Sequence, residues 1–63
     1  MAQEAMLRLP EVKRRSGLSR STIYHLIDQG KFPRQVPLSA RAVGWPESSI
    51  SSWINDRLHG EAQ

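Results

Sequence analysis

The sequence predicts a mainly α-helical fold with a small β-hairpin: three helices and a short antiparallel sheet. Three observations lead to this expectation. Apolar side chains recur at helical spacing in two stretches, the segment 31–45 between them carries no such stripe, and the chain has only 63 residues. At that length we expect a single domain over 1–63, with an ordered core at about 6–59 and frayed ends at 1–5 and 61–63.

The best-marked element is a helix expected between Ser19 and Gly30. Ser19 suits the N-cap position because its side-chain oxygen can accept a hydrogen bond from a free amide of the first turn. Gly30 suits the left-handed position that follows a helix. One buried stripe at i, i+3, i+4 spacing is formed by Ile23, Leu26 and Ile27.

A shorter helix is expected upstream, over residues 10–16. Pro10 is preorganised for its first turn, and Gly17 lies where the chain must leave it. Only residues 17–19 separate the two helices, and the apolar Leu18 among them can fill the space between the helices. A helix, a three-residue turn with glycine and a second helix form the helix-turn-helix pattern. In that pattern the second helix enters the major groove of DNA by its N-terminal residues.

Two short strands are expected on either side of residues 39–41. Pro37 cannot donate to a strand ladder, so it should lie on a sheet edge or at a position whose amide would point outward. The turn lacks an Asn-Gly or Asp-Gly pair, which leaves its type open. Gly44 indicates either a close approach of backbone or a bend that brings the neighbouring indole inward, and we expect Trp45 and Phe32 to lie in the core. The apolar residues of the two strands are Val36, Leu38, Ala42, Val43 and Trp45.

A third helix is expected over residues 46–58, and residues 6–9 form either a short strand or a hydrophobic lead-in to the first helix. We favour the strand. Pro46 suits the first turn of the third helix, but the serines that follow it are mediocre helix formers, so packing must hold this helix. Its apolar stripe is expected to contain Ile50, Trp53, Ile54 and Leu58.

Positive charge is concentrated on the part of the chain with the helix-turn-helix pattern. The net charge is +3, but residues 8–41 hold eight cations against two carboxylates, a net charge of +6, while residues 42–63 have a net charge of −2. Such an asymmetry favours a polyanionic partner. Charge alone is equally consistent with a role in solubility.

The exposed face of the second helix is rich in hydrogen-bonding groups. Arg20 is the best candidate to read a guanine, because its planar fork matches the O6 and N7 acceptors; its alternative role is a phosphate clamp. Tyr24 can reach a phosphate or pack under the hairpin. The other polar side chains of this face and of the first turn are Ser19, Ser21, Thr22, His25 and Gln29.

Several of these residues also have a purely structural interpretation. Ser19, Ser21 and Thr22 can pass hydrogen bonds to a phosphate at the helix N-terminus, or serve only in capping. Arg14 and Arg15 suit the negative end of the first helix, and can equally contact the DNA backbone that this helix crosses.

An enzyme is not expected. His25 and His59 lie on different helices without a carboxylate or cysteine at ligand spacing, and no glycine-rich phosphate loop occurs. We therefore expect no catalytic residue, no cofactor and no metal site. No signal peptide or membrane span is visible, so we expect a soluble cytoplasmic protein that does not contact a membrane.

The segments GLSRSTIYHLIDQGKFP and RAVGWPESSISSWI together resemble the AlpA family of phage and prophage regulators, which are related to MerR-like winged helix-turn-helix proteins and to excisionases. The resemblance covers about residues 7–58. It implies a winged helix-turn-helix fold with Ser19, Arg20, Ser21, Thr22 and Tyr24 on the recognition helix. It also places Arg34, Ser39 and Arg41 on or beside the wing. The family often has glycine at the wing tip where this chain has Ser39 and Ala40.

Together these observations predict sequence-specific binding of double-stranded DNA by a small transcriptional regulator of phage or prophage type, at the bacterial nucleoid. Two alternatives stay open. The chain could be an excisionase that bends DNA for recombination, or a winged-helix module whose third helix joins a further copy or a recombinase such as an integrase. The expected DNA-contacting residues are Arg14, Arg15, Ser19, Arg20, Ser21, Thr22, Tyr24, His25, Lys31, Arg34, Ser39 and Arg41.

Overall fold

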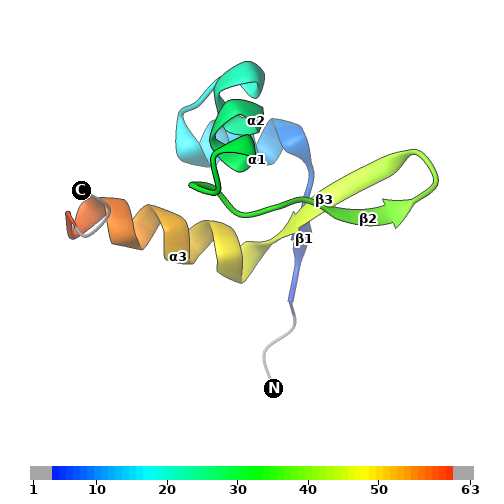
Figure 1. Ribbon diagram of the computed structural model, residues 1–63. Coiled ribbons are helices and arrows are strands. Elements are labelled where there is room, and N and C mark those ends of the chain that lie inside the picture. The colour runs from blue at the N-terminus through cyan, green and yellow to red at the C-terminus, as the bar shows by residue number, and fades with distance from the viewer. Residues whose placement is uncertain (1–3, 61–63) are drawn as a thin grey trace.

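The computed structural model describes residues 4–60, which form three helices and a three-stranded sheet. This confirms the predicted mainly helical fold with an antiparallel wing. The residues 1–3 and 61–63, where we expected fraying, lie outside the described residues. In chain order the elements are β1 (Met6–Leu7), α1 (Leu9–Ser16), α2 (Arg20–Asp28), β2 (Val36–Ser39), β3 (Ala42–Pro46) and α3 (Glu47–Leu58) (Figure 1).

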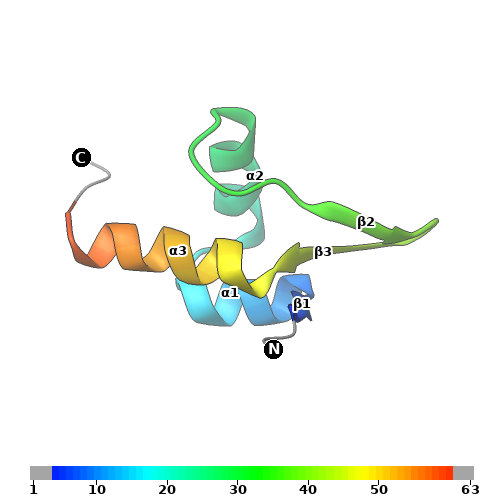
Figure 2. The same cartoon turned by 90° about the horizontal axis from the view of Figure 1, so that it is seen from below.

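The β2–β3 hairpin, called the wing from here on, projects beyond the helices. The wing and α3 extend in opposite directions from the place where β1 lies beside β3 (Figures 1 and 2). The molecule is correspondingly flat, with principal extents of 35 × 33 × 19 Å. Helices α1 and α2 pack at the centre, so the structure joins a compact body to one projecting arm on each side.

The sheet is antiparallel, with β3 between β1 and β2. Leu7 pairs with Trp45, and Val36 pairs with Gly44. A Cβ atom on Gly44 would lie 3.1 Å from the carbonyl oxygen of Leu7 and 2.9 Å from Leu38 Cδ1. The predicted close approach of backbone at Gly44 is therefore confirmed, and Pro37 lies on an edge strand as expected.

The wing turn consists of Ala40 and Arg41. Among the described residues only glycines have positive φ, which excludes the type I′ and II′ turns of two-residue hairpins. The pairing register instead shifts between Pro37 and Ser39. A bulge of this kind inserts one residue into a strand and increases its local twist, so the hairpin closes without an Asn-Gly pair.

A small apolar core joins all three helices to the sheet. Leu18 packs against its edge, and Gly17 has the left-handed φ of 75° that turns the chain from α1 toward α2. The predicted burial of Trp45 and Phe32 is confirmed. The buried apolar residues are Leu7, Val12, Ile23, Ile27, Phe32, Trp45 and Ile50.

Three sequence-based expectations are wrong. Leu58 is 77% exposed, because the last turn of α3 extends past the body and nothing in the described chain covers it (Figure 1). Pro46 is the last residue of β3 and precedes α3 rather than lying in its first turn. Leu9 begins α1, so β1 contains only the first two residues of the expected strand 6–9.

The last two positions of the segment 1–5, where we expected fraying, make hydrogen bonds to the start of α3. The Glu4 carboxylate accepts hydrogen bonds from the amide of Ser48 at 3.0 Å and from its hydroxyl at 2.9 Å. The amide of Glu47 donates to the carbonyl oxygen of Ala5 at 2.8 Å. The hydrogen bonds from Ser48 hold the pKa of the Glu4 carboxyl below its ordinary value. A segment distant in sequence thus satisfies free amides at the start of α3.

The burial difference along α3 predicts a difference in stability. Ile50→Val removes one methylene from a fully buried position and should lower the free energy of unfolding by about 0.5–1.5 kcal/mol. Leu58→Ala removes a larger apolar group but from an exposed site, and should change the free energy of unfolding by less than about 0.5 kcal/mol. Urea unfolding followed by tryptophan fluorescence measures both. A larger loss for Leu58→Ala would contradict the placement of this helix.

Candidate nucleic-acid interface

Helix α2 presents its first turn to solvent because its other side is held in the core. Ile23 and Ile27 are buried, which confirms the predicted stripe, while Leu26 is half-buried against the same cluster. The exposed residues of the first turns are Ser19, Arg20, Ser21, Thr22 and His25. Five side chains able to donate hydrogen bonds therefore lie together on one free surface.

Ser19 is the N-cap of α2, as its sequence position indicated. Its Oγ accepts from the amide of Thr22 at 3.3 Å and donates to Thr22 Oγ1 at 3.0 Å. Ser21 Oγ lies 3.3 Å from Ser19 Oγ. The capping role of Ser19 is thus present in the structure, and it leaves the Ser21 hydroxyl without a contact to the helix backbone among the hydrogen bonds of the described chain.

Tyr24 packs against the base of the wing, one of its two expected roles. Its ring is half-buried and meets Trp45 edge-on, with ring centroids 6.3 Å apart and an angle of 66° between the planes. On its other side the guanidinium carbon of Arg20 lies 5.1 Å from the ring centroid. Tyr24 therefore connects the first turn of α2 to β3.

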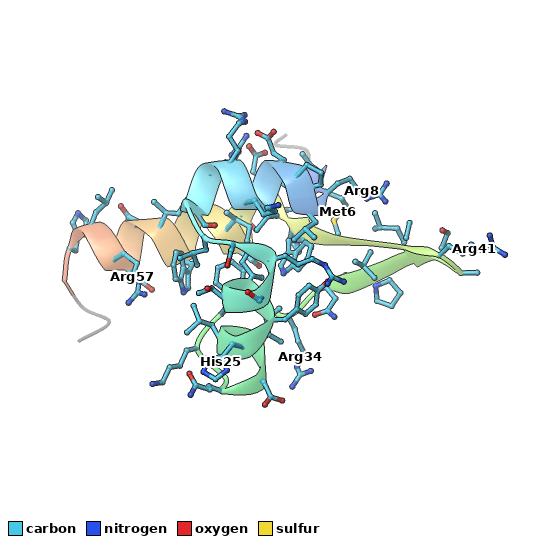
Figure 3. All side chains as sticks on the ribbon, turned by 90° about the horizontal axis from the view of Figure 1, so that it is seen from above. Met6, Arg8, His25, Arg34, Arg41 and Arg57 are labelled. Atoms are coloured by element: carbon cyan, nitrogen blue, oxygen red, sulfur yellow. The ribbon has the colours of Figure 1, made fainter. Side chains whose placement is uncertain are left out.

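The wing and the segment before it bring further cations to the region. Arg41 lies at the wing tip (Figure 3), and Arg34 belongs to the segment that leads from α2 to the wing. Ser39 accepts a hydrogen bond from the amide of Arg41 at 3.4 Å, so its side chain supports the turn. Arg34, Ser39 and Arg41 are all exposed.

Arg14 and Arg15 are already engaged with carboxylates. Both form ion pairs with Glu11, and Arg15 also contacts Glu47 of α3 at 3.2 Å. Hydrogen bonds from Arg15, and then from Arg14, hold the pKa of the Glu11 carboxyl below its ordinary value. The Arg15 side chain is 34% exposed and that of Arg14 is 72% exposed. Arg15 therefore links α1 to α3, whereas Arg14 remains accessible.

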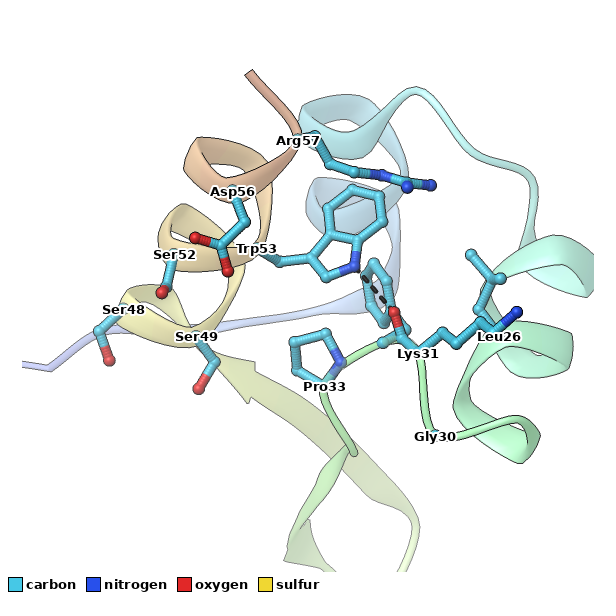
Figure 4. A pocket seen from close by; sticks show the side chains of 11 residues that line it. Leu26, Gly30, Lys31, Pro33, Ser48, Ser49, Ser52, Trp53, Asp56 and Arg57 are labelled. Carbon is cyan, nitrogen blue, oxygen red and sulfur yellow. Dashed lines mark hydrogen bonds between the residues drawn. The ribbon is translucent and has the colours of Figure 1, made fainter. Parts of the chain in front are cut away.

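Lys31 lies apart from the first turn of α2. It follows the C-terminal end of that helix, and its carbonyl oxygen accepts a hydrogen bond from Trp53 Nε1 at 2.9 Å. It also lines a groove between this segment and α3, together with Trp53, Asp56 and Arg57 (Figure 4). The structure thus does not bring Lys31 together with Arg20.

Arg8 is a candidate contact that was missing from the sequence-based set. It is exposed and lies one residue beyond the pair formed by Leu7 and Trp45. Figure 3 shows it on the same side of the molecule as the wing tip, whereas Arg57 lies on the opposite side. Arg8 was counted among the eight cations of residues 8–41 but was not named as a DNA contact. Its position beside the wing, however, depends on the pairing of β1 with β3, which no local motif indicates.

Comparison with known proteins agrees with this geometry. The family described as prophage CP4-57 regulatory protein (AlpA) matches residues 5–58. The chain belongs to this AlpA family. The match spans every helix and strand of the described structure and confirms the resemblance seen in the two sequence segments. The family is one of regulatory proteins rather than a class of enzymes.

Two curated relatives extend the comparison. An uncharacterised protein of Enterobacteria phage P4, ORF88, is 48% identical over 60 residues, which cover 95% of this chain and 68% of the relative. The DNA-binding transcriptional activator AlpA of Escherichia coli K12 is 34% identical over 58 residues, which cover 82% of this chain and 83% of the relative. In the described part of the chain, no helix has the length and apolar character needed to cross a membrane.

The hydrogen bonds at the start of α2 predict different effects on stability for substitutions at Ser19 and at Ser21. Ser19→Ala should lower the free energy of unfolding by about 0.5–2 kcal/mol, because it removes the hydrogen bond to the Thr22 amide. Ser21→Ala is the matched control and should leave stability nearly unchanged. Thermal melting followed by circular dichroism measures both variants. Equal effects of the two substitutions would contradict the capping role.

Proposed function

We propose that the chain binds double-stranded DNA sequence-specifically as a small phage-type transcriptional regulator. The first turn of α2 would enter the major groove, and the wing would lie on the adjacent backbone or in the minor groove. One observation carries the proposal: an exposed helix turn rich in hydrogen-bond donors lies beside a projecting hairpin with an arginine at its tip. The name of the Escherichia coli relative, a DNA-binding transcriptional activator, supports it.

Within this mode of binding the two arginines have different roles. Arg20, on the first turn of α2, would read a guanine through its O6 and N7 atoms, a contact worth about 1–3 kcal/mol of discrimination. Arg41, at the wing tip, would contact phosphate or enter a narrow minor groove, where the negative potential is enhanced. Arg8 and Arg34 would add phosphate contacts on the same side of the molecule.

These roles predict different binding defects. Arg20→Ala should reduce the preference for the favoured duplex over random duplex. Arg41→Ala should weaken binding to both duplexes alike and lower the slope of log affinity against log salt by about 1. Fluorescence anisotropy with labelled random duplex, and with DNA from the neighbourhood of the gene, measures both at two salt concentrations.

Arg57→Ala provides the matched control for that experiment. It removes the same charge from the opposite side of the molecule and should change affinity least (Figure 3). If Arg20→Ala kept both affinity and preference, α2 would not be the recognition helix. If the unaltered chain bound neither duplex at low salt, the nucleic-acid function itself would be wrong.

Transcriptional regulation and recombination control differ in their effect on DNA shape. An excisionase would bend its DNA site strongly. Complexes of the protein with DNA fragments of equal length, each carrying the site at a different position, would then migrate at different rates in a gel. For a regulator we expect promoter output to change with protein concentration in a transcription assay, with little dependence of mobility on site position. Strong bending without any effect on transcription would favour the recombination role instead.

A further inference from the structure

We propose that Tyr24 is a positioning residue that holds the Arg20 guanidinium in place for base reading before DNA binds. The inference rests on the proposed function, because it concerns how Arg20 acts there. It assigns to Tyr24 a role in specificity rather than a phosphate contact or packing alone.

The geometry forms a continuous support from the core to the surface. Trp45 is fully buried, and its Nε1 donates to the carbonyl oxygen of Pro33 at 2.9 Å, which fixes the indole plane. The Tyr24 ring meets this indole edge-on at 6.3 Å, and Arg20 lies over the tyrosine at 5.1 Å. Arg20 and Tyr24 are one helical turn apart, the spacing at which side chains of a helix meet.

The contact leaves the recognition groups of Arg20 available. A cation over an aromatic ring is attracted by the negative face of that ring, and this face is not a carboxylate that would pair with the five N–H donors of the guanidinium. Arg14 and Arg15 use such donors on carboxylates, but within residues 4–60 Arg20 forms no ion pair. The contact with the ring therefore restrains the guanidinium while no carboxylate of the described chain competes with guanine for its donors.

Ordering of the Arg20 side chain before DNA binds should increase the preference for the favoured duplex over random duplex. An arginine side chain has many rotamers, and fixing them on binding costs free energy that a pre-ordered side chain has already lost. The gain applies only where Arg20 makes an oriented, bidentate contact. It should therefore raise the affinity for the preferred duplex more than the affinity for random duplex, by about three- to tenfold.

Two substitutions separate positioning from packing. Tyr24→Phe keeps the ring and should retain the preference ratio within about twofold. Tyr24→Leu keeps apolar bulk against Trp45 but removes the ring, and should lower that ratio about three- to tenfold with little change on random duplex. In an Arg20→Ala background Tyr24→Leu should have no further effect on the ratio, because the positioned group is already absent.

A second measurement uses the free protein and does not depend on DNA. The ring current of Tyr24 should shift the NMR resonances of the Arg20 side chain upfield, and Tyr24→Leu should abolish this shift while Tyr24→Phe retains it. Arg57 serves as an internal control, since it lies 4.7 Å from the Trp53 ring centroid and its own shift should persist in every Tyr24 variant (Figure 4). Urea unfolding confirms that each variant is folded.

The outcomes distinguish this inference from the function on which it rests. Retention of the preference ratio by folded Tyr24→Leu would overturn the positioning role and leave DNA recognition by Arg20 intact. The same holds if the Arg20 resonances do not differ between the unaltered chain and Tyr24→Leu. Failure of the unaltered chain to bind duplex would overturn the proposed function, and the positioning role with it.

Discussion

The burial of Trp45 on the central strand is the interaction on which the rest of the structure depends. The indole lies at 0% exposure, with its backbone paired to Leu7 of β1 and its nitrogen bonded to the carbonyl oxygen of Pro33. The same ring contacts Tyr24 of α2. One residue thus connects the N-terminal strand through its backbone, and the segment after α2 and α2 itself through its side chain. In a chain this short, few other residues are available to do so.

Local signals predicted the elements, and non-local contacts account for what was missed. Ser19, Gly17 and the apolar stripe of α2 act within a few residues of one another, so the sequence alone indicated them. Glu4 binds Ser48 across 44 residues, a pairing that only the folded sheet makes possible. Leu58 was misjudged because helical periodicity shows which face a residue shares but not how far the body of the protein extends.

The candidate interface shows the same division. Sequence reasoning identified the exposed turn of α2 and the wing arginine, because helix direction and hairpin position follow from local pattern. It could not separate Arg15, bound to Glu11 and Glu47, from Arg20, which lies on an aromatic ring. Nor could it place Arg8 beside the wing. In each case the role of a cation depends on its neighbours in space, and the charge alone carries no such information.

The projecting wing has a consequence for how this protein can diverge. All four residues of β2 are exposed, and the strand is held by its pairing with β3 rather than by the core. Substitutions there cost little folding energy, whereas the body around Trp45 tolerates few changes. The hairpin is therefore the part of this fold that can change in sequence while the folded body stays the same.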